Sequence, residues 1–260
     1  MDKKNLFQIF LVMAGFIVSY FMDKILFSID PNWASWLPDS PFMWHFTWFI
    51  LRLTPPVLIT VILLKKQSLN ALGLSKDFPK AFLFAVLFTL PLFAGFAVLA
   101  EFNPEVTLMK VFSNCVFPGF YEELLIRSFL VGLLFRYFRW GFIPASLTGA
   151  LFFGAWHLYQ GHDFAGSMFA FLVTALGSVW FGWLYIEWRF NAWINISLHT
   201  LMNLSWLLFS ITGGAAGDII SNILRAITII ATVVVTLKVF SLKKGFIINR
   251  NTLWINRSTE

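Results

Sequence analysis

The chain has 260 residues, of which 58% are hydrophobic, 19% are aromatic and only 12% are charged, with a mean hydropathy of +0.76. This composition cannot form a water-facing surface, and it predicts an all-α polytopic membrane protein. The net charge of +6 does not indicate a nucleic-acid partner, because the basic residues sit between apolar runs, where they set topology and contact anionic lipid headgroups. The single cysteine, Cys115, excludes an intrachain disulfide and a cysteine-based metal site.

Apolar segments long enough to span a bilayer predict about eight transmembrane helices. They lie at roughly 5–22, 42–64, 80–100, 111–135, 144–160, 164–186, 191–210 and 217–237. The first segment follows Lys3 and Lys4 as a signal peptide would, but it lacks a small-residue cleavage site, so we expect it to stay as an anchor. Lys and Arg gather in the loops of one side, which places both termini in the cytoplasm.

These segments predict one transmembrane domain over residues 1–240 and a basic cytoplasmic tail over 241–260. The tail interleaves basic and apolar residues, which is typical of a segment lying on an anionic leaflet, although a disordered tail explains it equally well. The positive-inside bias favours the bacterial cytoplasmic membrane over the endoplasmic reticulum.

Polar and ionisable residues interrupt three of the predicted helices. They are Glu122, Glu123 and Arg127 in one helix, His157 in the next, and Asn195, His199 and Asn203 in a third. With a helical rise of about 1.5 Å per residue, Glu122 and His157 lie roughly 21 and 20 Å from the inner ends of their helices, and His199 and Asn203 roughly 12 and 18 Å. Because ionisable groups are costly in hydrocarbon, this comparable depth predicts one shared polar cavity near the middle of the membrane.

The spacing within each cluster suggests roles. Glu123 and Arg127 are four residues apart and share a helix face, which predicts a neutralising ion pair with a structural role. Glu122 lies about 100° away and lacks that partner, so it is the candidate general base that activates water. The alternative is a protonated carboxyl group that is hydrogen-bonded to a neighbouring helix.

Asn195, His199 and Asn203 recur every four residues and form one polar stripe that can line a cavity. Donors from His199 and Asn203 could stabilise an oxyanion while Glu122 and His157 position the water. Glu122, His157 and His199 are also a possible zinc ligand set, so the cofactor is either none or a divalent metal such as zinc.

The motifs Glu122-Glu123-x-x-x-Arg127, Phe153-x-x-x-His157 and His199-x-x-x-Asn203, in this order on successive helices, resemble those of the CPBP (CAAX protease and bacteriocin-processing, or Abi) family of intramembrane endopeptidases. Residues 115–210 resemble the catalytic core of this type II CAAX prenyl endopeptidase-like family, and no motif departs from its pattern. The resemblance implies eight helices around an intramembrane cavity.

For the site, the resemblance implies Glu122 as the residue that activates water, His157 as its partner, and His199 with Asn203 as oxyanion stabilisers. Glu123 and Arg127 would be supporting residues. The implied substrate is a membrane-associated or lipid-modified protein or a peptide precursor, and membrane lipids surround the enzyme.

Two other functions remain open from the sequence. The chain could be a non-proteolytic scaffold or regulator of another integral membrane protein, such as a sensor kinase, because some members of the family act in this way. A proton-coupled transporter is a weaker alternative, because inverted repeats are not visible.

Four residues outside the motifs also need an interpretation. We expect interfacial or solvated roles for His45 and His162, which fall near predicted helix ends or in loops. Arg52 could pair with a cavity carboxylate or bind a substrate carboxyl terminus, and Arg225 could reach the outer interface or pair with an acidic residue.

Overall fold

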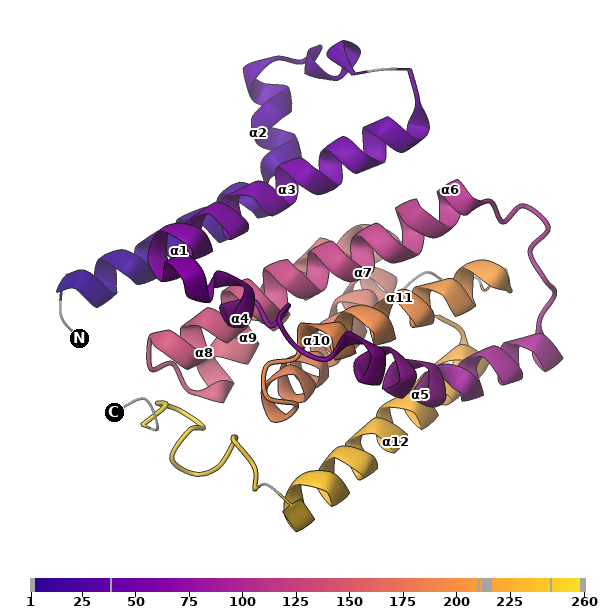
Figure 1. The fold of residues 1–260 in the computed structure, drawn as a ribbon. Helices are drawn as coiled ribbons and strands as arrows, with labels where there is room; N and C mark the ends of the chain where they lie inside the picture. The colour runs from indigo at the N-terminus through magenta and orange to yellow at the C-terminus, as the bar shows by residue number, and fades with distance from the viewer. Residues whose placement is uncertain (1–2, 38, 210, 212–216, 244, 258–260) are drawn as a thin grey trace.

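The computed structural model describes residues 3–37, 39–209, 211, 217–243 and 245–257, and every regular element in this part of the chain is helical, as predicted (Figure 1). The elements in chain order are α1 (Lys3–Tyr20), α2 (Met22–Ile29), η1 (Trp33–Trp36), α3 (Pro41–Leu64), η2 (Lys65–Gln67), α4 (Ser68–Ala71), α5 (Phe78–Leu99), α6 (Leu108–Val111), η3 (Phe112–Val116), α7 (Phe117–Glu122), η4 (Glu123–Gly132), α8 (Leu133–Tyr137), α9 (Phe142–Trp156), η5 (Leu158–Gln160), α10 (Phe164–Glu187), α11 (Ala192–Leu208) and α12 (Ile219–Lys243).

Each of the eight apolar segments found in the sequence coincides with a long helical stretch. Four of these stretches are long and apolar enough on their own to cross a membrane: Pro41–Ala71, Phe78–Leu99, Phe164–Glu187 and Ile219–Leu242. A fifth candidate is the pair α1 and α2, which is bent by 69° between its two helices. The chain is therefore a helical membrane bundle, whereas the count of eight spans and the side of the termini stay predictions.

The helix from Leu108 to Tyr137 is continuous but changes its hydrogen-bonding pattern along its length. η3 and η4 are π-helical, so their backbone hydrogen bonds reach back five residues instead of four. The wider turn of η4 begins at Glu123, directly after Glu122. π-helical turns are rare and occur frequently at functional sites, and here one starts between the two glutamates.

This composite helix, α6 to α8, lies in the middle of the bundle (Figure 1). On one side α1 and α3 pack against it, and a buried cluster joins α1 residues such as Phe16 to Phe129 and Leu130 of η4. On the other side a second buried cluster joins α5, α10 and α11 through Phe84, Phe181 and Leu198. Residues of η4 are almost entirely buried, so the polar groups that it carries must find partners inside the protein.

The tail packs against the bundle and is neither free nor laid out as an isolated helix. The backbone N–H groups of Ile247 and Ile248 donate to the two carboxylate oxygens of Glu187 at 3.0 and 2.9 Å. The amide of Asn256 donates to the carbonyl of Phe135 at 2.9 Å, and Trp140 forms a bridge with Ile255. Residues 245–257 therefore fold over the ends of α8, α9 and α10, while Lys244 lies outside the described residues. The division into domains at residue 240 stays a prediction.

Candidate active site

The two glutamates are brought to α11 by a close contact between helices. Gly119 lies one turn before Glu122, and a Cβ atom at Gly119 would lie 3.0 Å from the backbone nitrogen of Thr200. A side chain there would push α7 away from α11. The absence of a side chain at this glycine therefore lets Glu122 and Glu123 approach His199, the neighbour of Thr200.

Glu123 and Arg127 form the ion pair predicted from their spacing. Arg127 Nη1 lies 3.0 Å from Glu123 Oε1, and both side chains are fully buried. The guanidinium also lies over the ring of Phe153, 4.3 Å from its centroid. The other carboxylate oxygen of Glu123 accepts a 3.4 Å hydrogen bond from Asn195, which also donates to the carbonyl of Phe181. These contacts fix the carboxylate of Glu123, because a buried charge is tolerated only when it is paired and hydrogen-bonded.

His199 is held by Glu123 and faces Glu122. Its Nδ1 lies 2.7 Å from Glu123 Oε1, a distance at which an Nδ1–H group donates to the carboxylate. Its Nε2 lies 3.8 Å from Glu122 Oε2. This second separation is too long for a direct hydrogen bond and is suited to a bridge through one water molecule.

His157 lies at the end of α9 rather than inside a longer helix. The sequence predicted a helix over residues 144–160, but α9 ends at Trp156 and a 3₁₀ turn follows His157. The Nδ1 atom of His157 lies 2.7 Å from the carbonyl oxygen of Phe153, so the ring directs Nε2 away from the helix. Gly154 allows close packing as expected, since a Cβ atom there would lie 2.9 Å from the carbonyl oxygen of Phe171 on α10.

Asn203 has a partner that the sequence did not suggest. Its side-chain amide donates to the backbone carbonyl of Asn114 at 3.2 Å. Pro118, four residues after Asn114, has no N–H group to offer to this carbonyl. Because a side-chain amide carries two N–H groups, Asn203 keeps a second donor after this contact.

One cavity of about 970 Å³ brings together the four residues predicted to be catalytic. Glu122, His157, His199 and Asn203 all line it. Its other walls are mostly apolar and come from α10, α11 and α12, with Phe181, Trp180 and Ile229 among them. Arg225 also lines the cavity and lies over the ring of Trp206 at 4.9 Å. The shared cavity predicted from the depth of these residues is therefore present.

The geometry does not gather the possible zinc ligands into one site. Among the described residues, no group of three or more His, Cys, Asp or Glu side chains could hold a metal ion. Glu122 and His199 approach each other, but a ring nitrogen of His157 is bound to the carbonyl of Phe153. As placed, Glu122, His157 and His199 do not fit a zinc ion.

A comparison with protein-family models gives one match. Residues 104–205 match the family described as type II CAAX prenyl endopeptidase Rce1-like. These residues, called the Rce1-like region below, are similar to that family over less than half of the chain. The match includes all seven residues named in the three motifs and confirms the resemblance predicted from their order and spacing. No curated protein and no solved structure matches the chain.

The Rce1-like region coincides with the structural centre of the site. It begins just before the composite helix and ends within α11, so it contains Glu122, His157 and His199 and leaves out α3 and α12. Because the family is one of peptidases, the match together with the apolar helices supports a multi-pass membrane peptidase with a membrane-associated substrate.

Three features of the site were missed in the sequence. The hydrogen bond between Glu123 and His199 joins motifs 76 residues apart, and spacing within one helix cannot reveal such a contact. Asn195 was placed in the cavity-lining stripe, but it is fully buried and holds Glu123 instead. The carbonyl of Asn114 accepts from Asn203, and Pro118, which has no N–H group to offer to this carbonyl, was a visible signal for such a contact in the sequence.

Proposed function

We propose that the protein is an intramembrane endopeptidase that hydrolyses a peptide bond of a membrane-associated or lipid-modified protein or peptide precursor. The observation that carries this proposal is the convergence of Glu122, His157, His199 and Asn203 on one cavity. A carboxylate, two imidazoles and an amide donor are the groups that a water-dependent peptide hydrolysis needs.

In the proposed reaction, a water molecule lies between Glu122 and His199, where the two side chains are 3.8 Å apart. The Glu122 carboxylate accepts a proton from this water as its oxygen attacks the peptide carbonyl. The C–N bond then breaks, and the proton held by Glu122 moves to the leaving nitrogen. Water is consumed, one carboxylic acid and one amine are formed, and Glu122 returns to its starting state.

The remaining residues stabilise the charge that develops on the carbonyl oxygen. The second N–H group of Asn203 supplies a donor to the oxyanion, and Nε2 of His199 supplies another when the ring is protonated at both nitrogens, with Nδ1–H held by Glu123. The Nε2 atom of His157, whose Nδ1–H donates to Phe153, accepts a hydrogen bond from the water and orients it. Glu123 acts through His199: it holds the imidazole by Nδ1, as the buried carboxylate does in a serine protease triad. Arg127 and Asn195 in turn hold Glu123 in place.

The test compares the N-termini of membrane proteins by mass spectrometry in cells that express wild type, Glu122→Gln or no copy. Glu122→Gln preserves the shape of the side chain but removes its capacity to accept a proton. New N-termini that appear only with wild type, at equal protein levels, would support proteolysis and identify the substrate. If both proteins restore the same phenotype and neither creates new N-termini, the function is that of a scaffold for a partner membrane protein.

A further inference from the structure

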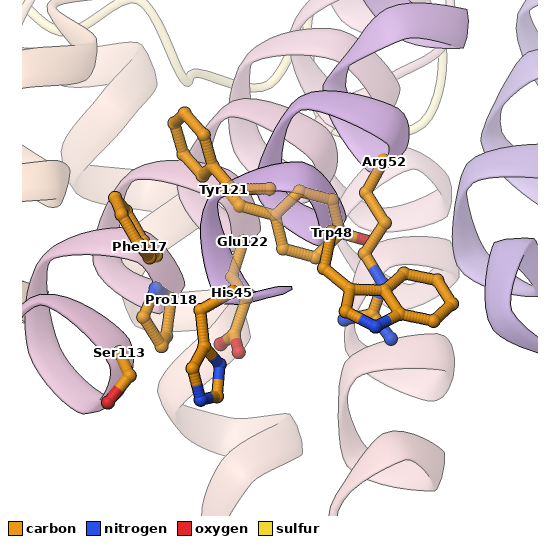
Figure 2. Close-up of a pocket in the computed structure, with 9 residues that line it drawn as sticks. His45, Trp48, Arg52, Ser113, Phe117, Pro118, Tyr121 and Glu122 are labelled. Atoms are coloured by element: carbon orange, nitrogen blue, oxygen red, sulfur yellow. The ribbon is translucent and has the colours of Figure 1, made fainter. Parts of the chain in front are cut away.

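A second and smaller cavity reaches Glu122 from a different side. Its volume is about 110 Å³, and it lies between the first half of α3 and the composite helix (Figure 2). The large and small cavities share three lining residues, Ser113, Pro118 and Glu122. Glu122 therefore borders both the large, mostly apolar cavity and the small one.

The small cavity is built with polar groups at membrane depth. Arg52 lies eleven residues after the start of α3, roughly 16 Å along the helix from Pro41. Its Nε is buried and has no hydrogen-bond partner among the described residues. The nearest carboxylate recorded for it belongs to Asp23, at 3.9 Å. His45, Ser113 and Glu122 add further polar groups to the lining.

Aromatic rings hold the Arg52 guanidinium in this position. The rings of Trp48, Tyr121 and Trp156 lie around it, with their centroids 5.3, 5.5 and 5.3 Å from Cζ. Figure 2 shows Arg52 and Trp48 on α3 beside Tyr121 of the composite helix. Cation–π contacts of this kind fix the plane of the guanidinium while its N–H groups stay able to donate elsewhere.

Size decides what this cavity can hold. A bound water needs about 10 to 15 Å³ of cavity volume and two to four polar partners. The small cavity, with about 110 Å³, therefore has room for several waters but not for a peptide segment. The partners are present as the Arg52 donors, the His45 ring, the Ser113 hydroxyl and the Glu122 carboxylate. His45 is exposed near the beginning of α3 and also lines the cavity, so a polar side chain that solvent can reach lies at the edge of the cavity.

We propose that the small cavity, which Arg52 lines, is a water reservoir that supplies the hydrolytic water to Glu122 from the side opposite the substrate. Because the peptide fills the large cavity in the proposed reaction, water can reach Glu122 by the small cavity without displacing substrate. Arg52 is a positioning residue here, since it holds water and does not touch the peptide. This inference rests on the proposed function.

The first test measures how close water comes to individual side chains, and it needs no substrate. Protein in lipid nanodiscs is exposed to an X-ray pulse, and the oxidation of individual side chains by radicals from nearby water is measured by mass spectrometry. We expect Tyr121, which is 4% exposed but borders the cavity, to be oxidised many times faster than Tyr185, which is fully buried elsewhere. Equal, slow oxidation of the two tyrosines in wild type would overturn the proposal.

Two substitutions of Arg52 separate water binding from charge and from structure. Arg52→Leu makes the cavity wall apolar, and an apolar cavity stays dry, so Tyr121 oxidation should fall to the level of Tyr185. Arg52→Gln keeps hydrogen-bond donors without the charge, so oxidation should remain close to wild type. If Arg52→Leu folds and leaves Tyr121 oxidation unchanged, the reservoir does not depend on Arg52.

The second test measures kcat and KM on the substrate that the comparison of N-termini identifies. We expect Arg52→Leu to lower kcat about tenfold, the loss that follows when one ordinary hydrogen bond to the water is removed, with KM unchanged. Arg52→Gln should recover most of this loss. A rise in KM with both variants would instead show that Arg52 binds an anionic group of the substrate. If wild type cleaves and Glu122→Gln does not, while Arg52→Leu is fully active, the reservoir is wrong but the proposed function stands.

Discussion

The Nδ1 atom of His199 lies 2.7 Å from the buried carboxylate of Glu123, and this contact joins two helices of the Rce1-like region. Glu123 is also paired with Arg127, so one carboxylate serves both the stability of the bundle and the orientation of an imidazole. The two roles can be separated experimentally because they depend on different partners.

Removing the charge of Glu123 should therefore affect folding and activity together. Glu123→Gln leaves the buried Arg127 without its counter-ion, and breaking such a pair costs about 3 to 5 kcal/mol of unfolding free energy. We expect denaturation in mild detergent to show that the free energy of unfolding of Glu123→Gln is lower than that of wild type by about this amount. The double variant Glu123→Gln with Arg127→Met removes both charges, so it should recover much of the stability but none of the activity. Recovery of activity in the double variant would show that the charge of Glu123 is not needed to hold His199, because the amide oxygen of Gln can still accept from Nδ1–H.

Asn203 should contribute to the reaction rate more than to stability. Its amide makes one contact, to the carbonyl of Asn114, and its second N–H group is the proposed oxyanion donor. Removing one such donor typically lowers kcat by about 10²- to 10³-fold, and we expect a loss of this size for Asn203→Ala in single-substrate kinetics. The control is Met202→Leu, a neighbouring apolar change in the same cavity wall, which should leave kcat nearly unchanged. Comparable effects of the two variants would argue against a specific donor at Asn203.

The contact between α7 and α11 at Gly119 should not tolerate a side chain. Gly119→Val places a branched group against the backbone of Thr200, and overpacking of this kind costs about 1 to 3 kcal/mol. We expect lower thermal stability and a stronger loss of activity, since Glu122 and His199 move apart. Gly182→Ala is the matched control, because the nearest atom to its added Cβ would lie 3.9 Å away. A fully active Gly119→Val protein would show that the close approach of these helices is not needed.

The sequence predicted the helical bundle and the gathering of the motif residues because both follow from local rules. The length of each apolar segment predicts a helix, and the similar depth of Glu122, His157 and His199 predicts that they lie at a common level in the membrane. The pairing of Glu123 with His199 depends on how two helices are rotated against each other, and a π-helical stretch such as η4, which begins at Glu123, points its side chains in other directions than an α-helix would. Nothing in the sequence around Glu123 predicts a π-helix. The early end of α9 at Trp156 was also not predicted, because Leu158 and Tyr159 continue the apolar and aromatic pattern after His157.

The attachment of the tail should depend on Glu187. Its carboxylate accepts the N–H groups of Ile247 and Ile248, and Glu187→Leu leaves both groups unpaired at a cost of about 1 to 3 kcal/mol each. We expect limited proteolysis to cleave within residues 245–257 much faster in this variant. Glu105→Leu is the control, since Glu105 is exposed and pairs only with Lys110 at the surface. Equal cleavage rates in the two variants would mean that other contacts hold the tail.

Chelation should leave activity unchanged. Because Glu122, His157 and His199 do not gather around a common point, the proposed reaction uses Glu122 to activate water without a metal. We expect dialysis against EDTA and then 1,10-phenanthroline to leave kcat within error of the untreated enzyme. Inactivation that added zinc reverses would mean that the three side chains move together around a metal during turnover.

The length of α9 has a consequence for the surrounding lipid. Its 15 residues extend roughly 22 Å, whereas the hydrocarbon core of a typical bilayer is about 30 Å thick. Leu147 and Leu151 of α9 are exposed, and in the predicted eight-span topology acyl chains would meet them on a helix that is shorter than the hydrocarbon core. In that topology the bilayer is expected to thin beside α9, which would bring the headgroup region down toward His157 and the cavity. Bilayers of short-chain lipids match this helix without deformation, so the thickness of the host membrane becomes a determinant of how readily a substrate segment reaches the cavity.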